Sequence, residues 1–199
     1  MVEIVLATRN RKKVEEIRRI FEGLTGFVFR TLDDFPSCPE VDEDADTFEG
    51  NAIKKAITVA CSTGMPSIAD DSGLEVYALN NAPGVMSARY AGPDGGDGAN
   101  NDKLLESMKH FTDDRRGARF VCCIAFALPD GNVRTFTGFS EGTIGLQMLG
   151  RSGFGYDPLF YPRGHTKTFA EMPPEEKDSL SHRKRALEQL KAYLETSVS

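Results

Sequence analysis

The sequence predicts a mixed α/β chain, and two observations support that prediction. Apolar stretches typical of strands alternate with segments of helical periodicity in the first half of the chain, and a strand–turn–strand pattern follows in the second half. The 199 residues are 40% hydrophobic and 27% charged, which is typical of a globular protein. We expect one domain, or one fold with two lobes, over residues 1–199.

Strands and helices alternate from the start of the chain. Residues 4–7 predict a short buried strand, and Asn10 after it is a plausible N-cap for a helix. Apolar residues then recur every three or four positions, as on one face of a helix. The expected helices of this half span residues 11–24 and 47–62, and the expected extended segments are 27–29, 67–69 and 74–79. We expect Asp70 and Asp71 at the end of the strand that begins at residue 67.

The second half is richer in glycine-containing loops. Residues 129–132, Pro-Asp-Gly-Asn, separate two apolar runs and predict a β-hairpin. The expected elements are a loop over 91–101, a helix over 104–111, strands over 120–128 and 133–139, a loop over 150–157 and a helix over 181–195.

Charge and cysteine content exclude several classes of function. The net charge of −6 disfavours binding to nucleic acid and to anionic membranes, so an anionic substrate needs a local positive patch. No apolar run approaches the roughly 20 residues of a membrane span, and the first residues do not resemble a signal peptide. The cysteines form no C-x-x-C pair, so we expect free thiols and a cytoplasmic location; they are Cys38, Cys61, Cys122 and Cys123.

A basic motif stands where the first strand passes into the first helix. A helix start offers unpaired backbone N–H groups and a partial positive charge, which favour phosphate. Lys13 lies one turn into the helix and can reach back to the same anion. A solvated basic helix start is the alternative, because the sequence lacks a Walker A loop. The motif consists of Thr8, Arg9, Asn10, Arg11, Lys12 and Lys13.

Carboxylates gather in two places. Six acidic residues lie between residues 40 and 49, and one of them can serve as a Mg²⁺ ligand, although a solvated loop is the alternative. Asp70 and Asp71 are the sharper signal, since adjacent carboxylates at a strand end repel each other unless a cation or hydrogen bonds offset the repulsion. A bound Mg²⁺ would do so and leave an oxygen to orient or deprotonate water. An Asx-turn is the alternative, but it needs only one aspartate.

Two later segments suit a purine base. In residues 152–158, glycines flank Phe154, so that the backbone can approach a planar ligand on which the ring stacks. Lys177 and Arg183 carry only hydrogen-bond donors, which match a 6-keto oxygen and not the 6-amino group of adenine. Core aromatics and surface charges at a helix cap are the alternatives.

Six motifs occur in order along the chain, at residues 8–13, 39–52, 69–74, 83–90, 154–158 and 181–183. With these motifs the chain resembles the inosine triphosphate pyrophosphatase family, which removes ITP, dITP and XTP from the nucleotide pool. The resemblance implies a two-lobed α/β fold around a long central mixed β-sheet with flanking helices, and an active-site cleft between the lobes. It also implies a homodimer and Mg²⁺ as cofactor.

The resemblance further implies residue roles. Asp71 corresponds to the general base and metal ligand, and Glu43 to a second metal carboxylate, with Glu40 as its rival. Further implied substrate contacts are Thr8, Asn10, Lys13 and Lys55 for the phosphates, Ser72 beside the reacting groups, and Phe154, Gly155, Tyr156, Asp157, Lys177, His182 and Arg183 for the base. Arg9 replaces the glycine usual in the first motif, which affects the local backbone or adds positive charge beside the phosphates.

The implied reaction yields the monophosphate and pyrophosphate. Asp71 or its neighbour activates a water that attacks the α-phosphorus, while Lys13 and Lys55 stabilise the departing pyrophosphate. Three alternatives stay open: a pyrophosphatase for modified pyrimidine triphosphates, a nucleic-acid-binding module that uses residues 9–13, and a nucleotide sensor without turnover. Exclusion of the 2-amino group is the hypothesis for discrimination against GTP.

Overall fold

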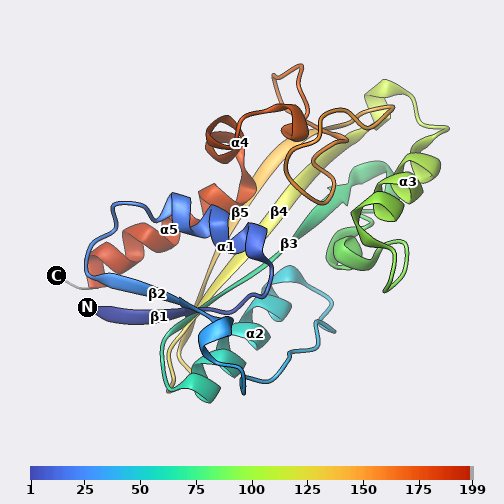
Figure 1. Ribbon diagram of the computed structural model, residues 1–199. Helices are drawn as coiled ribbons and strands as arrows, with labels where there is room; N and C mark the ends of the chain where they lie inside the picture. Colours follow the sequence, from blue (N-terminus) through green and yellow to red (C-terminus); the bar gives the residue numbers. More distant parts are fainter. Residues whose placement is uncertain (198–199) are drawn as a thin grey trace. The chain divides into compact units, whose positions relative to one another are not determined.

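A computed structural model describes residues 1–197 of the chain (Figure 1). Helices and strands alternate in the first half, as the periodicity predicts. The elements are β1 (Val2–Leu6), α1 (Arg11–Ile20), β2 (Phe27–Thr31), α2 (Phe48–Thr63), β3 (Ser67–Val76), α3 (Gly96–Met108), β4 (Gly117–Ala127), β5 (Val133–Ile144), β6 (Phe160–Pro162), α4 (Pro174–Leu180) and α5 (His182–Ser197).

Within residues 1–197, six strands form one mixed sheet in the order β2-β1-β3-β4-β5-β6. β1 pairs in parallel with β2 and with β3, whereas β5 and β6 are antiparallel. The expected α/β class with a mixed sheet is therefore confirmed. None of the helices in the described part of the chain combines the length and apolar character needed to span a membrane.

The chain divides into two compact units. Unit 1 comprises residues 1–71, 122–138 and 183–199, and unit 2 comprises residues 72–121 and 139–182. Strands β3, β4 and β5 each contribute residues to both units. Each unit has its own buried apolar cluster.

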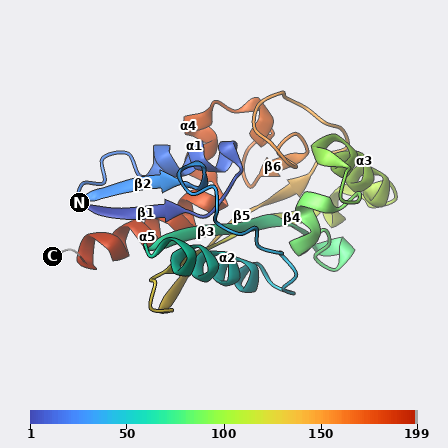
Figure 2. The same ribbon diagram turned by 60° about the horizontal axis from the view of Figure 1, so that its bottom comes forward.

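Unit 1 is a layered α/β structure. Its apolar cluster joins Ile17 of α1 and Leu187 and Leu190 of α5 to Ile4 and Ile68 of the strands. Figures 1 and 2 show α1 and α5 on one side of β1 and β3 and α2 on the other. Successive strand residues point to opposite faces, so neighbouring side chains of β3 are presented to different helices.

Helix α2 is bounded by a cap at each end. The hydroxyl of Thr47 accepts a hydrogen bond from the Gly50 amide at 3.0 Å, and Gly64 closes the helix in the left-handed conformation with φ of 69°. Its buried face includes two polar residues, Asn51 and Lys55, one turn apart. They are the residues by which α2 contributes to the site described below.

Unit 2 is held together around Phe120, Phe160 and Phe169, whose rings pack against one another. The buried guanidinium of Arg116 donates to the carbonyl oxygens of Met108, Ile144 and Gly145 at 2.6–2.8 Å. One charged group therefore satisfies backbone acceptors at the end of α3 and at the end of β5.

Several elements differ from the sequence-based expectation, and three of these differences affect polar residues discussed below. β3 continues to Val76, so Asp70 and Asp71 lie inside a strand and not at its tip. The expected loop over 91–101 already contains the start of α3, because Asn100 accepts a hydrogen bond from the Ala91 amide and donates to the Ala88 carbonyl. Helix α4 was not expected; it begins with Pro174 and ends just before Ser181, so that the final helix starts at His182.

Candidate functional site

The basic motif lies at the β1–α1 junction of unit 1. The Asn10 carboxamide oxygen accepts hydrogen bonds from the amides of Lys12 and Lys13 at 3.0 and 3.3 Å, and the Asn10 amide donates to the Thr8 hydroxyl at 3.2 Å. The N-cap prediction is confirmed. Two of the amides expected to bind phosphate are thus capped by the protein itself, and the exposed positive charge of this turn comes from the side chains of Arg9, Arg11 and Lys12.

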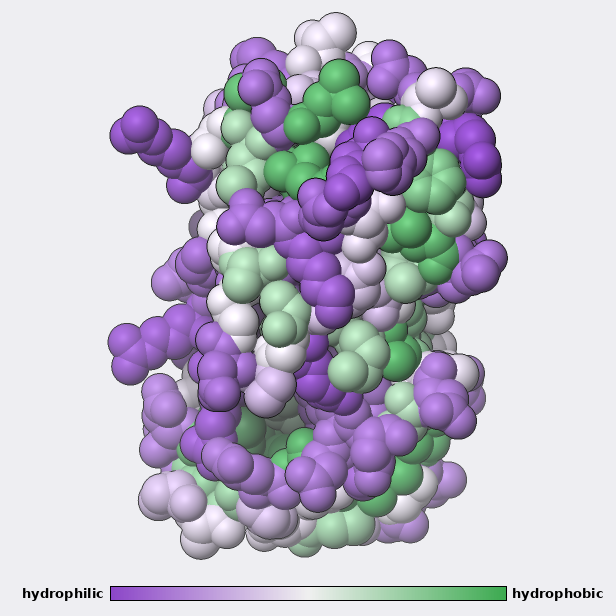
Figure 3. Space-filling view, turned by 90° about the vertical axis from the view of Figure 1, so that its right-hand side faces the viewer, coloured by the Kyte–Doolittle hydropathy of each residue, from purple (hydrophilic) through white to green (hydrophobic). Residues whose placement is uncertain are grey.

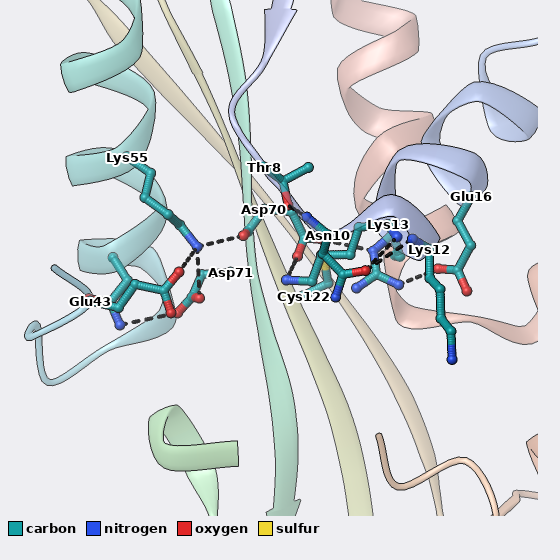
Figure 4. A network of polar contacts seen from close by, with 12 residues as sticks. Thr8, Asn10, Lys12, Lys13, Glu16, Glu43, Lys55, Asp70, Asp71 and Cys122 are labelled. Atoms are coloured by element: carbon teal, nitrogen blue, oxygen red, sulfur yellow. Dashed lines mark hydrogen bonds and ion pairs between the residues drawn. The ribbon is translucent and has the colours of Figure 1, made fainter. Parts of the chain in front are cut away.

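Lys13 belongs to a buried chain of ion pairs on the α1/α5 side of β3 (Figure 4). Its ammonium pairs with one carboxylate oxygen of Asp70, whose other oxygen accepts from Arg183 Nε at 2.8 Å and from the Cys122 thiol at 3.1 Å. Arg183 in turn pairs with Glu16. Burial alone would raise the pKa of Asp70, but Arg183 and Lys13 hold it well below the usual range. Asp70 is therefore a fixed negative charge.

Lys55 forms a second polar cluster, on the α2 side of β3. Its ammonium donates to Glu43 Oε1 at 2.5 Å, to the Asp70 carbonyl at 2.8 Å and to Asp71 Oδ1 at 3.0 Å. The other carboxylate oxygen of Asp71 accepts from the Asn51 amide group at 3.2 Å. Figure 4 shows the side chains of Glu43 and Asp71 converging on Lys55, away from Lys13 and Glu16.

The two aspartates therefore serve different purposes. Because side chains alternate along a strand, Asp70 faces α1 and α5 while Asp71 faces α2. The expectation that the pair jointly grips a cation is corrected, since Asp70 is neutralised by Arg183 and Lys13 on its own side. Asp71 and Glu43 instead both pair with the ammonium of Lys55.

The electrostatics of this cluster suit a proton acceptor. Burial raises the pKa of Asp71, with Lys55 opposing the rise and Glu43 adding to it. The Lys55 pKa is also raised: burial acts against the ammonium, but the carboxylates of Asp71 and Glu43 outweigh that effect. Asp71 is thus a more basic carboxylate than a solvated one, held beside a permanent positive charge.

The donor set near Asp71 also fits a hard divalent cation. Mg²⁺ is typically held by one or two carboxylates completed by water and substrate phosphate oxygens. Glu43 and Asp71 supply two carboxylates around one position, while Glu40, the rival ligand, is exposed. Among residues 1–197 no group of three or more histidine, cysteine, aspartate or glutamate side chains forms a closed metal cage. The chain thus offers an open pair of ligands.

Unit 2 holds the residues expected at the base. Asp157 Oδ2 accepts from the Phe154 amide and from the Lys177 ammonium, both at 2.8 Å, and that ammonium lies 4.8 Å from the centre of the Phe154 ring. Tyr156 is buried, and its hydroxyl donates to the Ser87 carbonyl at 2.8 Å. Within this unit Phe154 is the partly accessible aromatic of the loop.

Helix α3 fixes the middle of this loop. Asp97 Oδ2 accepts from the Gly155 amide at 2.7 Å, and Asn101 donates to the Gly155 carbonyl at 2.8 Å. Both backbone polar groups of Gly155 are therefore held by the first turns of α3. The sequence did not indicate Asp97 or Asn101, because they lie in the segment interpreted as a loop.

Two predicted donors at the base have partners inside the protein. His182 stacks on Phe120 with ring centres 4.8 Å apart, and it is buried. Arg183, in unit 1, directs Nε and Nη1 at the carboxylates of Asp70 and Glu16. Contact of either residue with a purine remains a prediction. Ser72, expected beside the reacting groups, is the half-buried residue that follows Asp71 in β3.

Sequence reasoning missed Asn51 and Glu16. Asn51 precedes Lys55 by four positions on α2, so both side chains lie on the same face and reach Asp71. That spacing was visible in the sequence. Glu16 carried no such signal, because its partner Arg183 is 167 positions away.

Comparison with known proteins identifies the family to which the chain is similar. Residues 4–193 match the Ham1 family. The dITP/XTP pyrophosphatase of Syntrophobacter fumaroxidans is 52% identical over 187 residues, which cover 94% of this chain and 79% of that protein. The dITP/XTP pyrophosphatase of Geobacter sulfurreducens is 49% identical over 98% of this chain and 97% of its own length. The structure of a Ham1 protein from Coxiella burnetii superposes with a TM-score of 0.91 at 42% identity, covering 98% of this chain and all of that one.

Proposed function

Because the chain belongs to the Ham1 family, we propose that it hydrolyses deaminated purine nucleoside triphosphates (dITP, XTP and ITP) to the monophosphate and pyrophosphate. The predicted family resemblance is confirmed by relatives about half identical over nearly the whole chain. The observation that supports the chemistry is the cluster at Asp71: a buried, raised-pKa carboxylate hydrogen-bonded to Lys55 beside Glu43.

In this proposal Asp71 accepts the proton of the attacking water. Lys55 and Asn51 position its two carboxylate oxygens, and a positioned base typically contributes about 10²–10⁴-fold to the rate. Asn51 holds the second carboxylate oxygen at 3.2 Å, so that the orientation of Asp71 is set before substrate arrives. Proton transfer then requires no rearrangement of the base.

The phosphates bind to basic side chains of unit 1. Lys13 pairs with Asp70, and its positive charge also opposes the rise of the Asp71 pKa. Lys13 and Lys55 donate to phosphate oxygens and offset the charge that develops on the pyrophosphate. The exposed side chains of Arg9, Arg11 and Lys12 attract the anion to an otherwise acidic protein.

Glu43 and Asp71 would hold a Mg²⁺ ion in this proposal. When bound, the ion supplies positive charge that polarises phosphate oxygens and lowers the pKa of water. Two carboxylates are too few to surround the ion, which fits a Mg²⁺ ion whose coordination would be completed by water and substrate oxygens. Addition of EDTA is expected to abolish hydrolysis, and excess Mg²⁺ is expected to restore it.

The base binds to residues of unit 2. Phe154 offers its ring for stacking, and Lys177, fixed by Asp157, supplies a donor for a 6-keto oxygen. A 6-amino group in the same place would meet a donor and leave both groups unpaired. Sites that read a polar group in this way can reject the wrong partner by about 10⁴-fold or more.

The decisive experiment measures pyrophosphate release from a panel of triphosphates with and without Mg²⁺. We expect dITP, XTP and ITP to be hydrolysed with a much higher kcat/KM than ATP, and Mg²⁺ to be required. Equal kcat/KM for ITP and ATP would refute the proposal that Lys177 recognises a 6-keto oxygen. Preference for methylated pyrimidine triphosphates would shift the substrate class and leave the reaction unchanged.

We also propose that the protein acts as a homodimer in the cytoplasm, where its substrates are formed. Exposed apolar side chains of unit 2, Tyr77, Met86, Phe139, Leu146 and Met148, are candidates for the contact surface. On the face in Figure 3, apolar groups lie in separate patches among hydrophilic ones. Light scattering coupled to size exclusion is expected to give twice the chain mass of 21.9 kDa.

A further inference from the structure

Each of the three N–H donors of the Lys55 ammonium has an acceptor within the protein. An ammonium group has three N–H donors, and here three oxygens lie within 2.5–3.0 Å of Nζ: a carboxylate oxygen of Glu43, a carboxylate oxygen of Asp71 and the carbonyl of Asp70. The side chain is only 11% exposed. The lysine is therefore built into the protein and does not extend into solvent as most lysines do.

These three oxygens are of the types that a hard divalent cation takes. Mg²⁺ prefers carboxylate and carbonyl oxygens, and two of the oxygens around Lys55 belong to Glu43 and Asp71, the proposed metal ligands. The ammonium thus lies where the charge of a cation is needed. Without it, two carboxylates would face each other in a largely buried site, which is unfavourable.

We propose that Lys55 is a built-in counter-ion that competes with Mg²⁺ for Glu43 and Asp71, and that metal binding releases its ammonium to the phosphates. The inference rests on the proposed metal ligands and adds a role for Lys55. Binding of Mg²⁺ to the two carboxylates satisfies their charge and repels the neighbouring ammonium. Lys55 keeps the Asp70 carbonyl as its anchor, and the two N–H donors it loses from the carboxylates become available for phosphate oxygens.

This exchange couples the metal to the substrate. In the metal-free protein the ammonium stabilises the carboxylate pair, so Mg²⁺ alone binds weakly. A triphosphate brings oxygens that accept the released donors and complete the metal coordination. Mg²⁺ and substrate are therefore expected to bind more tightly together than either does alone, a coupling that is reciprocal by thermodynamic linkage.

Calorimetric titration of the nucleotide-free protein with MgCl₂ tests the competition without measuring activity. Lys55→Met removes the competing charge, and we expect Mg²⁺ to bind at least about tenfold more tightly than to the unmodified protein. Lys54→Met is the matched control: Lys54 is the adjacent helical lysine, pairs with Asp44 at 2.7 Å and is exposed. It removes the same charge from the same helix and is expected to leave Mg²⁺ affinity unchanged.

Lys55→Gln is the second variant, because it keeps hydrogen-bond donors near the carboxylates and protects the fold if Lys55→Met does not refold. It is also expected to bind Mg²⁺ more tightly. Affinity equal to or below that of the unmodified protein in a folded Lys55 variant overturns the competition, as does an equal gain in Lys54→Met.

Two further variants separate this inference from the metal site itself. Glu43→Gln and Asp71→Asn are expected to lose Mg²⁺ binding. If they bind Mg²⁺ as the unmodified protein does, the proposed ligands are wrong and the inference falls with them. If they lose binding while the Lys55 variants show no gain, the ligands stand and the exchange alone is refuted.

Discussion

Asp70 and Asp71 are neighbours in β3, yet their carboxylates bind to different lysines on opposite sides of the strand. Asp70 pairs with Lys13 near α1, and Asp71 pairs with Lys55 on α2. The strand therefore separates a structural carboxylate, that of Asp70, from the proposed catalytic carboxylate of Asp71, with no residue between them. The Asp70 carbonyl, which accepts from Lys55, links the two sides.

Replacement of Asp71, the proposed catalytic carboxylate, is expected to remove activity and preserve the fold. Asp71→Asn keeps the size of the side chain, but its single carbonyl oxygen can accept from only one of the two donors, Lys55 or Asn51, and it is not basic. Turnover of dITP should fall by at least about 10²-fold, the lower limit for loss of a positioned base. Steady-state kinetics alongside circular dichroism check this, and a variant with normal kcat would exclude Asp71 as the base.

Replacing the structural carboxylate is expected to affect stability first. Asp70→Asn leaves the buried Arg183 with less compensating charge, and breaking a buried ion pair typically costs about 3–5 kcal/mol. Urea denaturation measures that loss. Asp44→Asn is the control, since Asp44 belongs to an exposed pair with Lys54 and should leave the midpoint unchanged. Equal midpoints for Asp70→Asn and the unmodified protein would show that the buried chain contributes little.

The loop around Phe154 is expected to depend on one glycine. Gly153 has φ of +77°, and a Cβ there would lie 2.0 Å from Asp157 Oδ2, the oxygen that holds Lys177. Gly153→Ala should destabilise unit 2 by about 1–2 kcal/mol through the backbone alone and raise KM for dITP by moving Asp157. Thermal unfolding and kinetics test both effects.

Gly98→Ala is the control for this loop variant. Gly98 lies in α3, and no atom outside its own helix backbone lies within 4 Å of the place that an alanine methyl would take, so alanine should be neutral or slightly stabilising. If both glycine variants behave alike, the space and the backbone angle at Gly153 are unimportant.

The four cysteine thiols are expected to react with a thiol-specific reagent at very different rates. Cys61 is exposed, whereas Cys38, Cys122 and Cys123 are buried. Burial, reinforced by Asp70, raises the pKa of Cys122 well above its ordinary value, and burial raises that of Cys123 to about 11. Since the thiolate is the reactive form, a thiol-specific reagent at pH 7 should label one cysteine quickly in the native protein and four after denaturation.

The pH dependence of this labelling has a definite sign. A raised pKa keeps Cys123 protonated through neutral pH, so its native-state reactivity should increase only as the pH approaches about 11. The Cys61→Ser variant isolates the buried thiols. Rapid labelling of that variant at pH 7 would contradict the burial of the remaining three.

Much of unit 1 could be predicted because its signals are local. The N-cap at Asn10, the apolar face of α1 and the caps of α2 follow from residues a few positions apart. The mixed α/β class followed from the same patterns. The extent of β3 did not, since two adjacent aspartates are unfavourable in a strand unless partners from elsewhere neutralise them, and those partners are distant in sequence.

Other features could not be predicted for the same reason. The sequence predicts Arg183 as a donor to the purine base, but it could not reveal the carboxylate partners Glu16 and Asp70, which are 167 and 113 positions away. The start of α3 looked like a loop because its glycines have low helix propensity, and only tertiary hydrogen bonds from Asn100 and Asn101 offset that. Sequence patterns identified which residues are polar and where they stand, but not which distant groups compensate them.

The pairing of Arg183 with Glu16 and Asp70 has a consequence for biosynthesis. A growing chain that has not yet reached α5 has both acidic groups in place but lacks the guanidinium that both of them bind. Until the last helix leaves the ribosome, the buried Asp70 carboxylate can pair with Lys13 but not with Arg183, so the charge balance of β3 is expected to be completed only when α5 is added.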